Sequence, residues 1–485
     1  MNSLGLNGSL WMGAQSLNTQ RTAIETIGNN ISNVNTPGYV RQRANIVTND
    51  TFGIGGETTN GSKVQNIASL RDNMLDTLVQ QSLGTQGYAD NQANLTSTVQ
   101  DALGEQFTSS ASSSSSATTI SGSGPVQDAM SSFFGSLQTL AATPEDATTR
   151  QLVVSNAQTL ATSINGAYSR VQSTQSQIAA AASTTVSQIN QLATTIATLN
   201  RQITSVESAS GQEANDLRDS RAQAITQLSS LVNVTTTAGI NGQVNVALSD
   251  NPAVVLVNGI DGGGAGTSQS LSVTYNASAA TPLTVSASTT GALGAGIPEG
   301  GSLGSDLNVA NVVIGSSNGE TGLLGALDGV ANSLRTQVNA QNAAGFDLNG
   351  NAGGAIFTGT GASDLAVSST VASNPSLIAA GNGTGPLDGS NAQKMADLQN
   401  STTITPAFQS MVAGLGQTTS AAADNQATQD AVTKALQTQQ NSVEGVSIDE
   451  EMTNLIAFQQ AYDASARFIT TISSMYDTLV NHTGT

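Results

Sequence analysis

The stretch Gly28-Asn29-Asn30-Ile31-Ser32-Asn33-Val34-Asn35-Thr36-Pro37-Gly38-Tyr39 organises the N-terminal part of the chain. Ahead of it an apolar residue recurs every seven positions, which places a narrow stripe on a helix and is typical of a coiled-coil seam. The helix pattern stops at the asparagines, whose side chains bond readily to nearby backbone groups. Pro37-Gly38 predicts a turn, because proline disfavours a helical residue before it and glycine accepts φ > 0. On periodicity alone, the simpler interpretation is a surface helix with an ordinary end.

Composition bounds the class of the chain and its partners. With 485 residues, 38% of them hydrophobic, the chain has room for about two to four domains with buried cores. Only 10% of the residues are charged, against roughly 25% in ordinary globular domains, so much of the surface is uncharged and polar. The formal net charge of −19 argues against a nucleic-acid partner, because neutralising phosphates requires clustered Lys and Arg.

The chain contains no cysteine, which excludes a disulfide, a thiolate zinc site and a cysteine nucleophile. No charged segment followed by an apolar one indicates a cleavable signal peptide, and the longest apolar runs are far too short to span a bilayer. We therefore expect no cleaved leader.

Periodicity also predicts long helices in the middle of the chain. No proline occurs between Pro144 and Pro252, and apolar residues follow a seven-residue lattice from Ile164 to Val206. This pattern predicts about 50 residues of nearly continuous helix within a bundle. From about Asn233 the period changes to two and turn signals separate the apolar runs, which predicts a β-rich insert over 235–315.

The last helix repeats the pattern of the first. Its apolar residues again step by seven, and three acidic residues at 449–451 lie in the first turn, where negative charge suits the helix dipole. An Asp/Arg cluster at 216–221 predicts a solvated salt-bridge face, which contributes little to stability. A helical hairpin is expected to start near Pro406 and to lead into this last helix.

Both ends of the chain resemble the bacterial flagellar rod, hook and hook-associated proteins. The signature turn covers about 1–45 together with its helix, and the segment from Asp449 to Arg467 is similar to the C-terminal helix of the same family. Phe458-Gln459-Gln460-Ala461-Tyr462 favours the hook-associated branch. So do three internal blocks, which are Phe133-Phe134 with Pro144 and Arg150, then Arg218-Asp219, then Phe346 to Gly350. The signature turn consists of Asn29, Asn30, Asn33, Asn35, Thr36, Pro37, Gly38 and Tyr39.

Periodicity and resemblance together predict an α+β, mainly α fold. It has long terminal helices in a coiled-coil-like bundle, a central long-helix bundle domain and a β-rich outer insert. We divide the chain into six segments. They are the N-terminal axial helix and turn (1–45), a hairpin plus helix (46–110), a long-helix bundle domain (125–234), a β-rich outer domain (235–320), a helix with mixed strands and loops (321–404), and a C-terminal helical hairpin and axial helix (405–485).

The two terminal stripes must be covered, because an isolated helix is marginal in water. Residues 1–49 carry three Arg and one Glu, and residues 441–485 carry one Arg and six acids, so opposite net charges favour pairing of the two ends. The simpler interpretation is a hairpin that closes one monomer. The resemblance favours packing beside other subunits, since repeated contacts between identical chains generate a tube or helix. The predicted subunit-interface residues are Leu10, Leu17, Ile24, Ile27, Ile31, Val34, Ile448, Leu455, Tyr462, Ile469 and Tyr476.

The resemblance implies a structural subunit of the bacterial flagellum at the junction between hook and filament. It implies a location outside the cell, export in the unfolded state and polymerisation through the N- and C-terminal helices, which we expect to be mobile in the free subunit. Expected partners are copies of the chain in a ring or tube, hook protein, the second hook-associated protein, the export apparatus and a chaperone. Neither nucleic acid nor membrane insertion is expected. The predicted chaperone contacts are Leu455, Phe458, Tyr462, Ile469 and Ile472.

Two other classes of protein remain open. One is a different axial subunit, such as a hook protein or the second hook-associated protein, against which Arg218-Asp219 and the block from Phe346 to Gly350 argue. The other is a secreted adhesin or hydrolase with flagellin-like ends. A glycan-binding or activity assay on 235–390 would distinguish the latter.

No catalytic pattern is found. The only histidine is His482, so a histidine-dependent triad or a multi-histidine metal centre is excluded. The phosphate-binding G-x-x-x-x-G-K-[ST] pattern does not occur. Asp347, Asn349 and Asn351 imitate the start of a calcium loop, but Ala352 and Thr358 replace its glycine and glutamate, so a turn is preferred. We predict no enzyme activity, no cofactor and no metal site.

Overall fold

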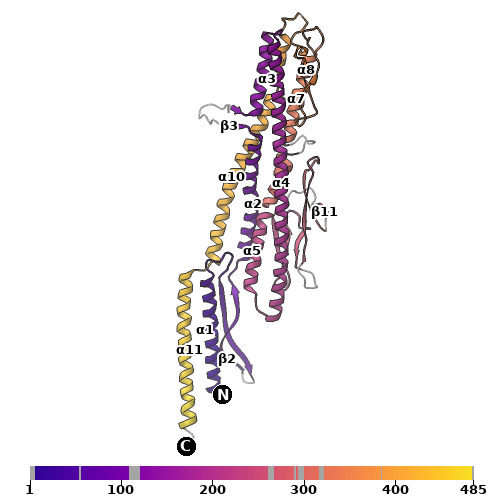
Figure 1. Ribbon diagram of the computed structural model, residues 1–485. Helices are drawn as coiled ribbons and strands as arrows, with labels where there is room; N and C mark the ends of the chain where they lie inside the picture. The colour runs from indigo at the N-terminus through magenta and orange to yellow at the C-terminus, as the bar shows by residue number, and fades with distance from the viewer. Residues whose placement is uncertain are drawn as a thin grey trace. The chain divides into compact units, whose positions relative to one another are not determined.

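The fold is described here from a computed structural model, which covers residues 6–53, 56–108, 121–259, 267–288, 291–292, 300–315, 322–383 and 385–482 (Figure 1). The chain divides into two compact units. Unit 1 comprises residues 1–84, 189–270 and 430–485, and unit 2 comprises residues 85–188 and 271–429. The sequence is serine-rich at 109–116, where a connection between segments is expected, and these residues lie outside the described ranges. Long helices dominate and the sheets are small, which confirms the predicted mainly α fold.

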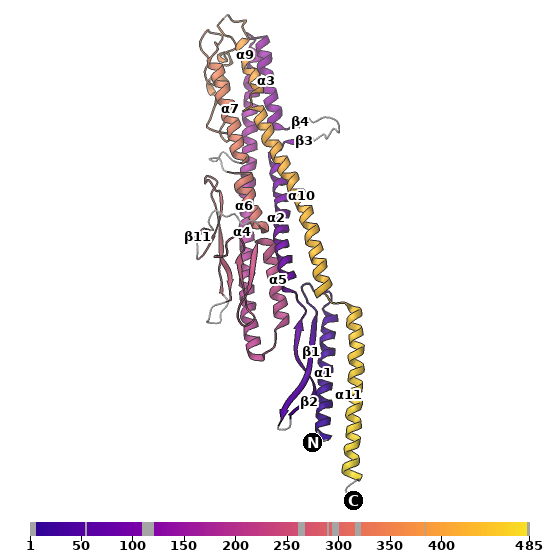
Figure 2. The ribbon, with the colours of Figure 1, turned by 180° about the vertical axis from the view of Figure 1, so that it is seen from behind.

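In unit 1 both ends of the chain pack together. The N-terminal helix α1 (Leu6–Ser32) contacts the C-terminal helix α11 (Ile448–His482) and an antiparallel hairpin of β1 (Gln42–Gly53) and β2 (Gly56–Ser69). Figures 1 and 2 show α1 and α11 side by side from opposite directions. The hydroxyl of Thr19 donates to the Ser62 carbonyl oxygen at 2.8 Å and so ties α1 to β2. A hairpin is expected within 46–110, and its first strand begins slightly earlier, at Gln42.

The rest of unit 1 joins helix ends to a small sheet. It contains the first part of α2 (Asn73–Leu103), the last part of α4 (Ala147–Ser210), all of α5 (Asn215–Leu231) and the end of α10 (Thr405–Glu444). The four strands pair antiparallel in chain order and bury Val246, Leu256 and Val257 completely. They are β5 (Val234–Ala238), β6 (Val244–Leu248), β7 (Val255–Asn258) and β8 (Thr267–Ser268).

Unit 2 is built on α3 (Pro125–Ala142) and the first part of α4. The phenylalanines Phe133 and Phe134 are fully buried with ring centroids 5.2 Å apart, as the sequence predicts for core residues. Burying each such side chain stabilises the folded state by roughly 1.5–3 kcal/mol. Phe133 also meets Phe357 edge to face, with centroids 5.4 Å apart, so the segment around Phe357 packs onto α3.

Shorter elements complete unit 2. A three-stranded sheet has the order β11–β10–β9, and two two-stranded ladders pair β3 with β4 and β12 with β13. The strands are β3 (Gln106–Thr108), β4 (Ser121–Ser123), β9 (Leu271–Tyr275), β10 (Leu283–Ala287), β11 (Gly291–Ala292), β12 (Phe357–Thr358) and β13 (Ala366–Val367). The helical elements are α6 (Gly301–Asn308), the π-helical η1 (Val309–Val313), α7 (Leu323–Ala343), α8 (Ser369–Ser373), η2 (Pro375–Leu377), α9 (Ser390–Asp397) and η3 (Leu398–Asn400).

The helix α4 confirms the prediction of one long central helix. It runs for 64 residues without interruption, longer than the 50 expected. The seam position at Tyr168, Gln175 and Ala182 is buried as expected, and the polar Gln175 is satisfied there because its amide donates to the carbonyl oxygens of Ala310 and Gly315 at 2.8 and 2.7 Å.

Two predictions about elements are wrong. The range 235–315, expected to be β-rich, also contains α6 and η1, because a short helix has too few apolar positions to reveal a period of 3.6. The helical hairpin expected from 405 is a single 40-residue helix, α10, since no Pro or strong turn signal interrupts Thr405–Glu444 after Pro406. The helix that follows, α11, packs on α1.

Candidate functional site: the terminal helix pair

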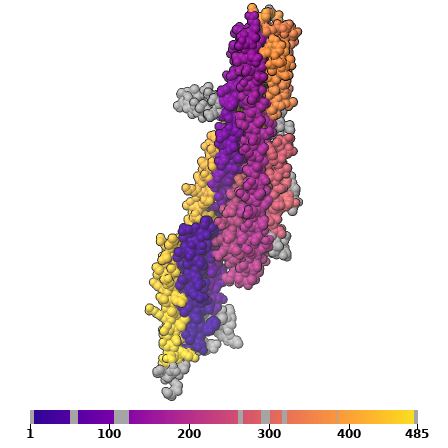
Figure 3. Space-filling model, in the orientation of Figure 1, coloured from indigo at the N-terminus to yellow at the C-terminus, as the bar shows by residue number. Residues whose placement is uncertain are grey.

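The helices α1 and α11 run antiparallel in a regular register. The hydroxyls of Ser16 and Ser465 lie 3.0 Å apart, and the Asn30 amide donates to the Glu451 carboxylate at 2.9 Å. Asn30 and Ser16 are 14 residues apart on α1, and Ser465 and Glu451 are 14 apart on α11. Two heptads therefore separate the two contacts on each helix, as in a coiled coil. In the space-filling view of Figure 3 the indigo and yellow segments touch along their length.

A glycine lets the two helices approach closely. A Cβ placed on Gly13 would lie 2.6 Å from Cγ1 of Ile469, so no larger residue fits there without displacement. Gly13 itself is buried. By contrast, nothing lies within 4 Å of the corresponding position on Gly28, which sits on the exposed side of the same helix.

The signature turn ends α1 through local bonds. The Asn33 backbone N–H and side-chain amide both donate to the Asn29 carbonyl oxygen, at 3.1 and 3.0 Å, and the Thr36 hydroxyl donates to the Asn33 side-chain oxygen at 3.1 Å. Gly38 has φ 77°, a left-handed conformation that favours glycine. These bonds explain why asparagines and a Pro-Gly pair follow the helix. Asn35 and Pro37 are exposed.

Asn30 holds the turn to α11. Its side chain is 1% exposed and uses all of its hydrogen-bonding capacity. The amide nitrogen donates to Glu451 and to the Gln42 carbonyl oxygen at 2.8 Å, and the amide oxygen accepts from the Tyr39 hydroxyl at 2.9 Å and the Gln42 N–H at 3.0 Å. Burial and the nearby acids Asp216, Asp219 and Glu451 raise the pKa of Tyr39 to about 12, which keeps its hydroxyl a donor.

Arg41 pairs with the acidic residues at the start of α11. Its guanidinium donates to Glu451 at 2.7 Å and to Glu450 at 2.6 Å. Glu451 is 2% exposed, and a buried carboxylate is tolerated only when its oxygens are paired. We call the set Asn30, Tyr39, Arg41 and Glu451 the polar clasp. It fastens the first turn of α11 to the signature turn.

A second buried acid lies at the joint between α10 and α11. The Glu444 carboxylate accepts from the Asp72 N–H at 2.7 Å, at the start of α2, and its carbonyl oxygen accepts from the Arg41 N–H at 2.9 Å. Burial raises the pKa of Glu444 to about 7, and the nearby Asp76 acts in the same direction. The joint thus holds a carboxyl that titrates near neutral pH.

The cluster at 216–221 is more buried than predicted. Asp219 is 7% exposed, pairs with Arg71 at 2.9 Å and accepts from the Val40 N–H at 3.4 Å. Arg221 is 8% exposed and donates to Asn200 and to the Gly242 carbonyl oxygen, at 2.8 and 2.6 Å. Its pKa is lowered to about 10, mainly by burial. The prediction of a solvated face is therefore wrong for these two residues, because the distant segments that hold their bonding partners cover them, and no local pattern reveals that cover.

The predicted interface residues fall into two groups. On α1, Ile27 is buried and Leu10, Leu17, Ile24 and Ile31 are half-buried, as is Val34 in the turn after this helix. On α11, Leu455 and Ile469 are half-buried, whereas Ile448, Tyr462 and Tyr476 are exposed. Of the predicted chaperone contacts, Phe458 and Ile472 are also half-buried. One stripe per helix was predicted, but on α11 the structure divides the apolar residues between a seam toward α1 and an exposed face.

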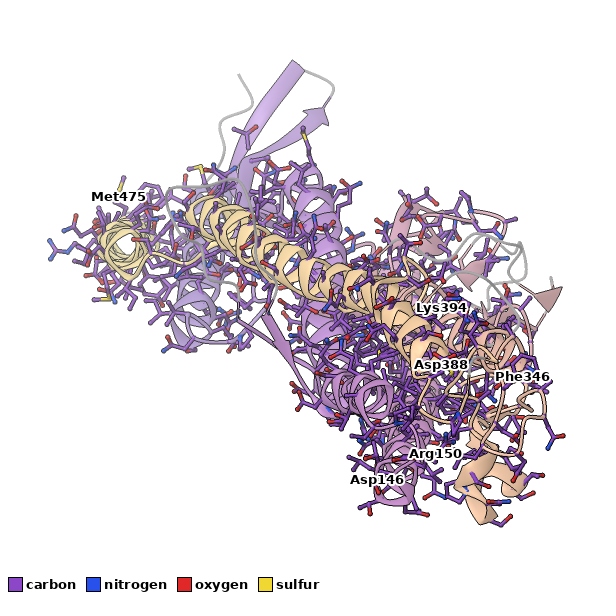
Figure 4. The ribbon with its side chains drawn as sticks, turned by 90° about the horizontal axis from the view of Figure 1, so that it is seen from above. Asp146, Arg150, Phe346, Asp388, Lys394 and Met475 are labelled. Atoms are coloured by element: carbon purple, nitrogen blue, oxygen red, sulfur yellow. The ribbon has the colours of Figure 1, made fainter. Side chains whose placement is uncertain are left out.

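The helix α11 exposes several large apolar side chains, which are spread over more than one side of it. Met475 is 52% exposed and points away from the helix in the view from above (Figure 4). On α1, Trp11 is 75% exposed. Exposed apolar side chains gathered on one element mark an interaction surface. The exposed large apolar residues of α11 are Ile448, Met452, Ile456, Tyr462, Phe468, Met475, Tyr476 and Leu479.

Sequence reasoning missed Arg41, Glu444 and the pairing role of Glu451. Three acids at a helix start suit the helix dipole, and that local explanation is complete without a distant partner. The signal that could have found them is the combination of an arginine directly after the signature turn with acids that open the last helix.

Unit 2 contains a buried arginine at another of the family blocks. Arg150 is 2% exposed and donates to the carbonyl oxygens of Pro144 and Ile378, at 2.8 and 2.6 Å. Burial lowers its pKa, and Asp347 opposes this effect. Asp347 accepts from two backbone N–H groups, those of Asn349 and Asn351, both at 2.8 Å, which is a turn rather than a cation loop. Figure 4 labels Arg150 with Phe346 and Asp388 beside this turn.

Within the residues described, no group of three or more His, Cys, Asp or Glu side chains is placed to hold a metal ion. The helices in this part of the chain include none with the length and apolar character needed to cross a bilayer.

Comparisons with known proteins find flagellar families that match both ends of the chain and its middle. Residues 116–357 match the flagellar hook-associated protein FlgK helical domain, 437–481 the flagellar basal body rod FlgEFG protein C-terminal family, and 12–39 the flagella basal body rod protein family. Flagellar hook-associated protein 1 of Salmonella typhimurium is 27% identical, covering 96% of this chain and 98% of its own length. The Bacillus subtilis protein of the same name is 26% identical and covers 97% of each.

A solved structure shares the fold. The flagellar hook junction protein FlgK from Burkholderia pseudomallei superimposes with a TM-score of 0.61 at 18% identity, over 76% of this chain and 100% of that one. Paired terminal helices, the first of which ends in an Asn/Pro-Gly turn, define the chain as an axial protein of the bacterial flagellum. Within that class it belongs to the flagellar hook-associated protein 1 family, structural subunits at the junction between hook and filament.

Proposed function

We propose that this junction subunit polymerises with copies of itself, in a ring or tube, through the exposed faces of α1 and α11. The observation that carries the proposal is the set of large apolar side chains that α11 exposes, together with Trp11 on α1. Burying such side chains removes apolar area from water and stabilises the contact by about 25 cal/mol per Å². Adjacent copies are the expected cover, since axial subunits pack side by side by repeated heterologous contacts. The chain acts as a structural part and not as an enzyme.

Further partners follow from membership of the family. They are the hook protein on one side, the second hook-associated protein on the other, the export apparatus, and a cytoplasmic chaperone that binds α11 through Leu455, Phe458, Tyr462, Ile469 and Ile472. The chain leaves the cell unfolded, which its lack of cysteine suits. The six segments bounded at 45, 110, 234, 320 and 404 remain our proposed division into parts.

Deletion of the gene tests the junction role. Cells without the protein should carry hooks without filaments and shed flagellin into the medium. Complementation should then use Ile456→Ser, Met475→Ser and Leu479→Ser together. The matched control is a triple substitution at exposed polar positions of the same helix, Thr453→Ser, Gln460→Ser and Ser474→Ala.

We expect the control to restore filaments and the apolar triple variant to be secreted without restoring them. Secreted protein is measured in the medium, which separates failure of export from failure of assembly. Filaments of normal number and length on the triple variant would disprove polymerisation through this face.

Two measurements on the purified chain test the remaining parts of the proposal. Limited proteolysis should cut the terminal helices of the free subunit before α4, because α11 packs mainly on α1 and most of its residues are exposed. Termini as resistant as α4 would contradict mobile ends. The chaperone should lose its affinity for a chain that lacks 445–485, and unchanged affinity would contradict the assigned contacts.

A further inference from the structure

The polar clasp is unusual for a helix seam because it buries two strongly polar groups. Asn30 and Glu451 are 1% and 2% exposed, whereas the neighbouring seam position Ile27 is apolar. The hydrogen bond of Asn30 to Glu451 and the ion pair of Glu451 with Arg41 are made only when α11 meets the signature turn, whereas the other three bonds of Asn30, to Tyr39 and Gln42, lie within the N-terminal segment. A buried polar pair of this kind is satisfied in one arrangement of the helices and in no other.

The apolar part of the seam does not define one arrangement. On both helices, contacts repeat with the heptad, and the two observed pairs, Asn30–Glu451 and Ser16–Ser465, are two heptads apart. Sliding α11 by seven residues along α1 therefore brings heptad-related positions opposite one another again. Such a slip moves Ile469 away from Gly13, so the close packing at Gly13 also favours the observed register, but it leaves no buried charge without a partner there.

The polar residues do discriminate between registers. A slip of seven residues in one direction would place Glu451 opposite Ala23. The opposite slip would place Asn30 opposite Phe458. Each slip separates the buried Glu451 carboxylate from Asn30 and Arg41, and a buried charge without partners is costly.

Arg41 acts at the place where a slip must begin. Only residues 445–447 separate the end of α10 from the start of α11, so α11 can slide only if its first turns unwind. Arg41 holds that turn through Glu450 and Glu451, and its backbone N–H bonds to the Glu444 carbonyl oxygen.

We propose that the polar clasp fixes the register of α1 against α11, so that its removal lets the helices slide while they stay paired. Apolar burial along the seam then supplies affinity, and the clasp supplies alignment, as a single buried polar residue does in coiled coils. This inference goes beyond polymerisation, since it concerns how the two ends of one chain are matched.

Cysteine cross-linking tests the register, because the natural chain contains no cysteine. The reporter for the observed register is Ser16→Cys with Ser465→Cys, whose hydroxyls lie 3.0 Å apart. The two slipped registers are reported by Ser9→Cys and by Ala23→Cys, each combined with Ser465→Cys. The soluble full-length chain is oxidised mildly, and the disulfide-linked fraction of each pair is measured.

Each reporter pair is placed in three backgrounds: the unchanged chain, Asn30→Leu with Glu451→Leu, and the matched control Asn29→Leu with Asp449→Leu. The control makes similar substitutions on the same two helices at exposed neighbours of the clasp. In the unchanged chain and the control, we expect only the Ser16–Ser465 reporter to cross-link. In the clasp variant, the slipped reporters should cross-link about tenfold more than in the control.

Amide hydrogen exchange of α11 is measured on the same samples. The clasp variant should keep the protection of α11 beyond its first turns while it gains slipped cross-links. Slipped cross-links that stay at the control level would overturn the proposal, because register would then be set elsewhere. Loss of α11 protection would overturn it as well, since the clasp would hold the pair together and not align it. Neither readout requires polymerisation, so the result is independent of the proposed assembly.

Discussion

Glu444 makes the joint between α10 and α11 sensitive to pH. Its pKa is about 7 in the folded chain against 4.5 for the ordinary group, so folding favours the protonated form. The contribution to stability is fully present below pH 4.5 and is lost as the pH rises through 7. The joint should therefore open more readily at pH 8 than at pH 5.

The substitution Glu444→Gln removes this dependence. Glutamine keeps an oxygen that accepts from the Asp72 N–H but carries no charge, so the free energy of local opening at 440–451 should rise at pH 8 by up to about 3 kcal/mol. At pH 5 variant and parent should differ little. Amide hydrogen exchange at both pH values measures this, with the exposed Glu145→Gln as control. Equal opening of parent and variant at pH 8 would show that Glu444 is not the group responsible.

Arg150 has a similar importance in unit 2, where it bonds carbonyl oxygens of separate loops. Replacing it by methionine leaves those acceptors buried and unpaired, so Arg150→Met should lower the free energy of unfolding of this unit by about 3 kcal/mol. Arg150→Lys should recover only part of the lost free energy of unfolding, because an ammonium group lacks the planar fork of donors of a guanidinium. Urea denaturation measures the change. Arg201→Met, at an exposed arginine of the same helix, should cost under about 1 kcal/mol, and an equal loss there would refute the assigned role.

Single residues also mark the limit of prediction from the sequence. The signature asparagines were found from the sequence, and the local bonds of Asn33 follow from the chemistry of asparagine near a helix end. The role of Asn30 could not be found in this way, because its partner Glu451 is 421 residues away. Contacts of that kind depend on which elements meet, and no local pattern of residues contains that information.

Helix packing depends on one glycine of α1. Gly13→Leu places a side chain where Ile469 already lies, and overpacking of this kind costs about 1–3 kcal/mol. Gly28→Leu makes the same change on the same helix in open space and should instead stabilise it by about 0.5–1 kcal/mol, since glycine disfavours helix. Exchange of α11 amides should accelerate in the first variant only. If both variants behave alike, α1 and α11 do not pack closely at Gly13.

At the level of helices and strands, prediction from the sequence succeeded where the periodic apolar pattern was long. The 64-residue α4 and the 35-residue α11 contain many heptads, so their periodicity was sufficient to predict them. The eight residues of α6 contain about one heptad, and a period cannot be read from so few positions. For α11, periodicity identified the apolar residues but not which of them face α1, because that division depends on the partner helix.

The net charge of −19 acts on the molecule as a whole. Copies of an acidic chain repel one another, and salt screens this repulsion beyond a Debye length of about 10 Å at 0.1 M. If apolar contacts of α11 drive self-association, then it should strengthen about tenfold or more between roughly 20 and 300 mM NaCl. Sedimentation of the purified chain measures it. The variant with Ile456→Ser and Met475→Ser should not self-associate at either NaCl concentration, because it keeps the net charge and loses two exposed apolar side chains. Association that weakens with salt would show instead that ion pairs between copies hold the assembly together.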